Sequence, residues 1–380
     1  MRYGQDERQP QLSVRDFPPR QVDVLVIGAG QAGLATAHEL LRRGFTGYVQ
    51  DDAGAAPAVG TFIVLDGEWR PGGAWQHRWK SLTMATVNHI ADLPGMPVAE
   101  YDQNVPAAKF VPEYFASYEE KFDFPIFRPV VVRQVVAAGE HYAVDTNAGT
   151  FHARIIINCT GTWTRPFIPH YPGIATFRGV QLHTRDYVDG EQFWGEPVLV
   201  VGGGISALEI LLDLRKVTKR VDWATVHPPR WREFSQGLSE EQGRAVEDRV
   251  RARVVQGLRP LPVAAETGIP SSSPVRELVA RGKITHRPIF DRIAPYGAMW
   301  GEELVEYAGI IWATGFRPEL RHLAPLRIRE PGGGVKMSGT QVSKHPRIHL
   351  VGYGPGASTI GARRQARLAV QAAAQYLQQH

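Results

Sequence analysis

The sequence contains a single cysteine, Cys159, and this shortage excludes one kind of chemistry. One cysteine cannot form an internal disulfide, and no CxxC pair is present, so thiol–disulfide exchange within the chain is excluded. We interpret Cys159 as a small buried residue rather than a nucleophile.

Long apolar runs are also missing, because no stretch approaches the roughly 20 residues that cross a bilayer. The segment 1–20 is polar and charged, without an apolar part of the signal-peptide type. We therefore expect an N-terminal tail over residues 1–20 and a cytoplasmic protein with no membrane span.

Clusters of like charge and of metal-binding side chains are absent as well. The net charge is +5, and no lysine block or basic–aromatic stripe suggests nucleic acid. His77, His89 and His183 stand alone without zinc-ligand spacing, so no metal site is expected. The 380 residues, 43% hydrophobic and 21% charged, suit a soluble globular protein of two or three domains.

The first strong motif is GAGQAG, which follows an apolar strand over 22–28 and opens a helix-like stretch over 32–44. Gly28 permits the tight turn, Gly30 lets a diphosphate approach the backbone, and Gly33 lets helix and strand pack closely. Together with Gln31, these glycines place free N–H groups and the positive end of a helix at a phosphate. The motif predicts a dinucleotide site.

An acid at the end of the next strand should hold the ribose hydroxyls. Asp51 has the usual spacing, at 18 residues after Gly33, whereas Asp66 follows the better strand pattern TFIVLD. We predict Asp66, with Asp51 as the alternative.

The plan recurs in VLVVGGGISA, whose first glycine lies 174 residues after Gly28. That interval is too long for a solenoid repeat and indicates two nucleotide-binding folds. Gly202, Gly204 and Ser206 form the second expected site. The next strand, 221–226, ends before His227 with neither a clear acid nor a clear cation, so NADH and NADPH both stay open.

Two further apolar strands end in small-residue turns, CTGT over 159–162 and ATGF over 313–316. In a chain with two nucleotide folds, such turns are where the backbone passes between domains beside the bound dinucleotide. The candidates there are Thr160, Gly161, Thr314 and Gly315.

In order along the chain, GAGQAG, 72-GGAWQHRWKSL-82, 177-FRGVQLHTRDY-187, GGGISA and ATGFRP resemble the motifs of flavin-containing and Baeyer–Villiger monooxygenases, especially the short bacterial members. The resemblance covers residues 22–370 and implies an α/β fold with two Rossmann-like, three-layer domains built on parallel sheets. The NAD(P) domain would be inserted into the FAD domain, giving FAD-binding parts at 21–175 and 301–380 around an NAD(P)-binding domain at 176–300.

The resemblance also implies which residues meet FAD. Val132 would meet the adenine through its backbone, and the segment 352–358 would approach the flavin ring. The residues implied along FAD are Gly72, Gly73, Trp75, Leu82, Val132, Gly352, Tyr353 and Ser358.

Two catalytic candidates come from the same resemblance. His183 would lie in the linker that couples nicotinamide binding to the flavin domain, and Asn88 would be the polar group near the reactive flavin. A turn-forming role for Asn88 fits the sequence equally well. Tyr187 stands where the family motif usually has Trp or Pro.

The expected function is that of an FAD-dependent NAD(P)H oxidoreductase. It would be a monooxygenase that uses a flavin peroxide and dioxygen to oxygenate a small thioether, amine or ketone. Trp75, Trp79, Trp163 and Phe316 are candidate walls for such a site. Two alternatives stay open: a reductase or oxidase without oxygen insertion, and a non-catalytic redox-sensing protein. The oligomeric state is open, with a homodimer among the options.

Overall fold

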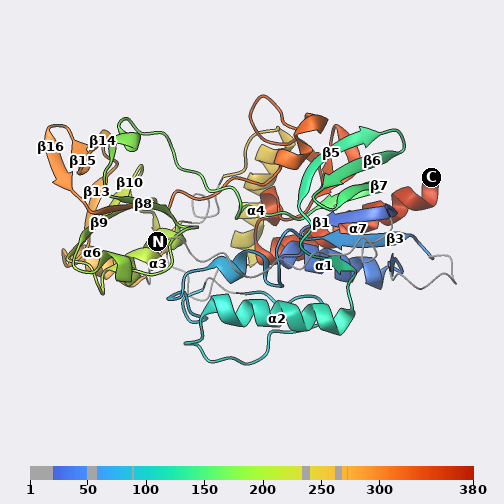
Figure 1. Cartoon of the computed structure of the whole chain (residues 1–380), viewed down its shortest axis with the longest axis horizontal. Helices are drawn as coiled ribbons and strands as arrows, with labels where there is room; N and C mark the ends of the chain where they lie inside the picture. The colour runs from blue at the N-terminus through green and yellow to red at the C-terminus, as the bar shows by residue number, and fades with distance from the viewer. Residues whose placement is uncertain (1–19, 49–57, 88–89, 233–239, 262–267, 272) are drawn as a thin grey trace.

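The computed structural model describes residues 20–48, 58–87, 90–232, 240–261, 268–271 and 273–380. The two largest sheets lie in two lobes (Figure 1). Both sheets are built around parallel strands, which confirms the expected fold of two Rossmann-like units.

The first sheet has β1 at its centre, parallel to β7 on one side and to β3 on the other. Its strands are β1 (Gln21–Ile27), β2 (Thr46–Gly47), β3 (Thr61–Leu65), β4 (Ile126–Phe127), β5 (Val132–Ala138), β6 (His141–Thr146), β7 (Gly149–Asn158), β18 (Met337–Ser338), β19 (Gln341–Val342) and β20 (His345–Leu350).

Alternate residues of β1 enter two different cores, which explains its unbroken apolar sequence. Val24 and Val26 pack with α1 (Gln31–Arg42) and α7 (Thr359–Gln379), whereas Leu25 and Ile27 face the β5–β6 side. Parallel strands covered on both faces have this composition. The helix α2 (Ala107–Phe122) and the 3-10 helix η2 (Gly73–His77) complete this lobe on the α1 side.

The second sheet is entirely parallel, in the order β13-β10-β9-β17-β8. The helices α3 and α6 contact each other, and a three-stranded antiparallel sheet adjoins the lobe. The elements are β8 (Val180–His183), β9 (Pro197–Val201), α3 (Ile205–Leu214), β10 (Arg220–Thr225), α6 (Pro274–Ala280), β13 (Thr285–Pro288), β14 (Arg292–Ala294), β15 (Gly297–Trp300), β16 (Glu303–Glu306) and β17 (Gly309–Trp312).

The expected domain limit between residues 300 and 301 does not coincide with the end of a sheet. It falls between β15 and β16, which are paired, and the following β17 lies between β8 and β9 in the second sheet. We therefore propose that the second domain ends after residue 312.

The helix α4 (Glu240–Val255) lies within residues 176–300, the range expected for the NAD(P)-binding domain. Its residues Val250 and Val254 are buried in the core of the first lobe, together with Tyr353. Figure 1 shows α4 beside the first sheet rather than on the second. The small two-stranded sheet of β11 (Trp231–Arg232) and β12 (Ile269–Pro270) joins the segments that lead to and from this helix. Within the part of the chain that the structure describes, no helix is long and apolar enough to cross a membrane.

Candidate active site

The first glycine turn connects β1 to α1 as the motif predicts. Gly28 has a φ of 98°, in the region that favours glycine. A Cβ on Gly33 would lie 1.9 Å from the carbonyl oxygen of Gly28, so only glycine permits this contact of helix and strand. A Cβ on Gly30 would meet nothing within 4 Å, and this residue caps α1 without a side chain. The first N–H groups of α1 are thus open to a ligand.

A cavity of about 660 Å³ lies at this turn, outside the carboxyl ends of β1, β3 and β7. Ligands of open α/β sheets bind at that edge, and the volume is in the range of small-molecule and cofactor sites. Its shape follows from backbone turns after three parallel strands. The expected residues that line it are Gly28, Gly30, Gln31, Asp66, Gly72, Gly73, Trp75, Val132, Thr160, Gly161, Gly352 and Ser358.

Asp66 directly follows β3 and lines the cavity, at the position expected for an acid that binds the ribose hydroxyls. Its Oδ2 accepts a hydrogen bond from Nε of Arg128 at 2.7 Å, and Arg128 also binds both carboxylate oxygens of Glu119 at 2.7 Å. Among the described residues, Oδ1 of Asp66 makes no hydrogen bond. Arg128 thereby orients the carboxylate and leaves one oxygen for a ligand. The alternative, Asp51, lies outside the described residues.

The loop before η2 lies directly against the first turn. Gly72 and Gly73 have φ values of 124° and 49°, and a Cβ on Gly73 would lie 3.0 Å from Cα of Gly30. Past η2, the Arg78 guanidinium lies over the Trp163 ring at 4.3 Å and the Trp75 ring at 5.3 Å. All three side chains line the cavity. Sequence reasoning did not single out Arg78.

The C-terminal glycine segment contributes backbone rather than side chains. The N–H of Gly352 donates to Oε1 of Gln365 at 2.9 Å, and the Ser358 hydroxyl caps α7 by accepting from the N–H of Gly361 at 3.0 Å. Tyr353 does not reach the cavity. Its hydroxyl accepts from the N–H of Val335 at 3.0 Å inside the core.

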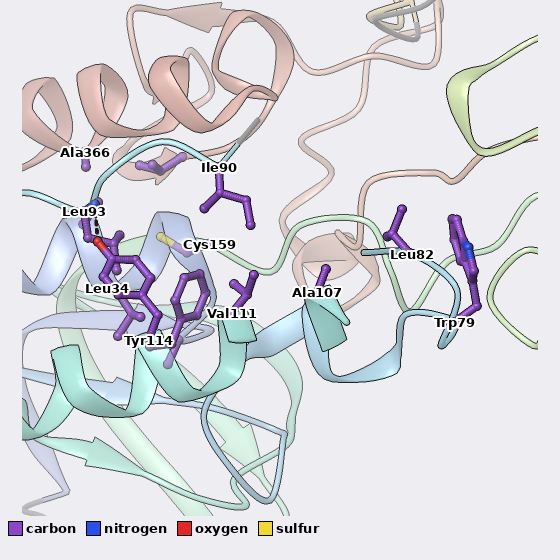
Figure 2. Packing of buried hydrophobic residues seen from close by; sticks show 14 of the residues in the cluster. Leu34, Trp79, Leu82, Ile90, Leu93, Ala107, Val111, Tyr114, Cys159 and Ala366 are labelled. Carbon is purple, nitrogen blue, oxygen red and sulfur yellow. Dashed lines mark hydrogen bonds between the residues drawn. The ribbon is translucent and has the colours of Figure 1, made fainter. Parts of the chain in front are cut away.

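Among the described residues, Leu82 and Cys159 contribute no reactive group to the cavity. Leu82 lies beside Trp79 at one end of the buried cluster that Figure 2 shows, and it packs rather than lining the cavity. Asn88 lies outside the described residues. Cys159 lines the cavity, but its side chain is buried in the cluster of Figure 2 with its Sγ 3.6 Å from Oγ1 of Thr36. Burial raises the pKa of its thiol to about 12, so it is no nucleophile at neutral pH. Among the described residues, no cluster of side chains could hold a metal ion.

The second glycine turn repeats the first between β9 and α3. Gly202 has a φ of 137°, and a Cβ there would lie 2.1 Å from the carbonyl oxygen of Ala313. A Cβ on Gly204 would meet nothing within 4 Å, so the start of α3, with Ser206, is open in the same way. His227 is exposed after β10, at the expected position of the second ribose.

Two linkers join the lobes and are hydrogen-bonded to each other. Thr160 donates its hydroxyl proton to the carbonyl of Glu319 at 2.6 Å, and Thr314 donates to the carbonyl of Phe167 at 2.6 Å. The N–H of Phe167 donates to the carbonyl of Gly315 at 3.0 Å. Thr160 and Gly161 line the cavity, whereas Thr314 and Gly315 form the return linker.

His183 binds the return linker at the end of β8. Its Nδ1 accepts from the N–H of Arg185 at 3.1 Å, so the neutral ring carries its proton on Nε2 and donates to the carbonyl of Gly315 at 2.9 Å. Burial lowers the pKa of His183, which keeps it neutral at pH 7. Its ring meets the edge of Phe316, which stacks on Trp163 at 5.0 Å.

Known proteins share this arrangement. The family model described as pyridine nucleotide-disulphide oxidoreductase matches residues 25–259. A flavin-containing monooxygenase from Stenotrophomonas maltophilia is 32% identical, with a TM-score of 0.74 over 94% of this chain and 99% of that one. A cyclohexanone monooxygenase from Rhodococcus sp. Phi1, solved with NADP+, has the same fold at 16% identity, with a TM-score of 0.64 over 93% of this chain and 84% of that one.

Among curated relatives, an uncharacterized CzcO-like oxidoreductase from Geobacillus kaustophilus is 31% identical over 51% of this chain and 51% of its own length. The chain thus matches about half the length of such relatives. The single buried cysteine sets it apart from any member that works through a dithiol. The chain therefore belongs to the pyridine nucleotide-disulphide oxidoreductase family and is similar over nearly its whole length to flavin-containing monooxygenases.

Proposed function

We propose that this chain is an NAD(P)H-dependent flavin monooxygenase that transfers one oxygen atom from dioxygen to a small organic substrate. The observation that carries the proposal is the junction of the two lobes. There the cavity at the first glycine turn meets linkers that lead to the second turn, and His183 binds the return linker. Cys159 is buried and has no second thiol, so the electrons do not pass to an internal disulfide.

The residues of the cavity fit FAD. The open N–H groups of α1 suit its diphosphate, which can approach the backbone closely because Gly30 has no side chain. Asp66 suits a ribose hydroxyl, and the backbone of Val132 suits the adenine. When bound, the flavin supplies the transfer of electrons from a nicotinamide to dioxygen. The second turn, at Gly202 and Gly204, would hold the diphosphate of NAD(P)H.

In the complete reaction NAD(P)H, a proton, dioxygen and the substrate give NAD(P)+, water and the oxygenated substrate. The test is a reaction under labelled dioxygen with a thioether, an amine and a ketone in turn. We expect one labelled atom in the product of one class and the other in water. Rates with NADH and NADPH, measured in the same assay, decide the nicotinamide that the sequence leaves open.

Two other outcomes would replace the proposal. Release of one hydrogen peroxide for each NAD(P)H consumed, with every substrate class, would identify a reductase or oxidase. Tight binding of both nucleotides without turnover would identify a redox sensor. A cytoplasmic location and a homodimer stay predictions.

A further inference from the structure

The Arg78 guanidinium is a cation without a partner in the cavity wall. Among the described residues, no carboxylate contacts it and no acceptor binds it, and its Nε is shielded from solvent without a hydrogen bond. Burial lowers the pKa of Arg78 to about 10, so it stays charged at neutral pH. A half-buried charge whose Nε is shielded without a hydrogen bond is costly, and binding of an anion would offset that cost.

The acids of the cavity do not supply that anion, because each has its own partner. Asp66 is bound by Arg128 at 2.7 Å, Glu68 by His77 at 2.9 Å, and Glu319 by Arg321 at 2.6 Å. These acids therefore leave the charge of Arg78 uncompensated, and an anionic group of a ligand would compensate it.

The position of Arg78 indicates which part of the ligand it faces. Its guanidinium is held against Trp163, and Trp163 stacks on Phe316, which meets His183 at the end of β8. The next two residues already contact the second lobe: Trp79 meets the Tyr187 ring, and the N–H of Lys80 donates to the carbonyl of Val188 at 3.2 Å. Arg78, which follows the end of η2, thus lies where the cavity meets the second lobe. The start of η2 lies against Gly30, at the open end of α1 that would bind the diphosphate.

We propose that Arg78 stabilises the negative charge that the flavin ring gains on reduction and thereby raises the reduction potential of the bound FAD. Hydride transfer moves one proton and two electrons, so the nicotinamide becomes cationic and the flavin ring gains one negative charge. Two flanking indole rings hold the half-buried guanidinium in place in the cavity wall. A charge that is already held in place costs little reorganisation when the new charge forms. This inference rests on the proposed use of FAD.

The test measures the FAD midpoint potential of purified holoprotein by anaerobic reduction against a reference dye. R78M keeps an unbranched side chain between the indoles and removes the charge, and R78K keeps the charge. R70M is the matched control, because Arg70 is an exposed arginine just before η2. Its Nε donates to Oε1 of Gln76 at 3.1 Å, and its carbonyl accepts from Nε2 of Gln76 at 3.3 Å.

We expect R78M to weaken binding of reduced FAD relative to oxidised FAD by at least about tenfold, which lowers a two-electron potential by about 30 mV. R78K should lower the midpoint potential by less than half as much as R78M does, and the midpoint potential of R70M should equal that of the parent protein. Should R78M fail to fold, R78Q gives the same comparison.

Three results would overturn the inference. An unchanged potential with loss of FAD would show that Arg78 holds the diphosphate. An unchanged potential with a raised KM for an anionic substrate would show that it faces the substrate. Equal losses in R78K and R78M would show that charge is not the cause. If the parent protein itself binds no FAD, the proposed function fails rather than this inference alone.

Discussion

Replacing Arg128 by methionine tests whether the cavity depends on a buried ion-pair triad. The Arg128 side chain is 12% exposed, and its partners Asp66 and Glu119 are 7% and 13% exposed. Removing one partner of a buried pair leaves uncompensated charge and costs about 3–5 kcal/mol. We therefore expect R128M to lower the free energy of unfolding of the first lobe by about 3 kcal/mol or more at pH 8. FAD affinity should fall as well, because Asp66 loses the group that orients it.

The loss should depend on pH with a defined sign. Burial raises the pKa of Glu119 even beside Arg128, and without the arginine the pKa rises further. A carboxyl group whose folded pKa is raised binds protons preferentially in the folded state, so it favours folding increasingly as pH falls through that pKa. The difference in stability between R128M and the parent should thus be largest at pH 8 and smaller at pH 5.5.

The assay is urea unfolding followed by tryptophan fluorescence at both pH values, with FAD affinity from quenching of flavin fluorescence. R251M is the matched control, because the Arg251–Asp248 pair is 58% and 67% exposed and such pairs contribute little. The double variant R128M/E119M should recover part of the loss, since one unpaired carboxylate is removed with it. An R128M protein as stable as R251M at pH 8, with parent FAD affinity, would refute the reasoning.

The remaining predictions concern the turns and the thiol. Gly33→Ala forces a Cβ to 1.9 Å from the Gly28 oxygen and should lower the thermal unfolding temperature by several degrees, which calorimetry measures. At Gly30 a Cβ meets nothing within 4 Å, so Gly30→Ala should fold normally yet bind FAD at least about tenfold more weakly, which flavin fluorescence measures. Gly204→Ala, where a Cβ would meet nothing within 4 Å, should raise the KM for NAD(P)H and leave FAD absorbance intact, and loss of both nucleotides together would contradict separate sites. Cys159 should resist iodoacetamide at pH 8 until urea unfolds the chain, as mass spectrometry can follow, and rapid labelling of the folded protein would contradict its burial.

Both glycine turns could be predicted from sequence because their causes are local. In each, an apolar strand, a tight turn and a helix start lie within about 20 residues, and each glycine has its own steric reason. The choice of Asp66 rests on the same kind of evidence and stays a prediction. The pattern of β3 was stronger than the usual spacing of Asp51, and β3 pairs directly with β1.

The domain limits depended on contacts that no local pattern contains. The pattern of α4 predicts a helix, but its apolar face does not say which lobe it will cover, and Val250 and Val254 lie in the first. Likewise, β17 carries a generic apolar strand sequence. Its place between β8 and β9 follows only from the complete order of the second sheet.

Arginines show most clearly where sequence reasoning ends. Arg128 and Arg78 both follow or adjoin aromatic segments, and nothing in their neighbours distinguishes them. Arg128 meets Asp66, 62 residues away, and becomes part of the framework that orients a carboxylate. Arg78 meets only the rings of Trp75 and Trp163 among the described side chains at its guanidinium, so its charge remains available to a ligand. Arg128 is structural because the fold places a carboxylate against its guanidinium, whereas Arg78 has no carboxylate beside it among the described residues. Tertiary contacts alone set that difference.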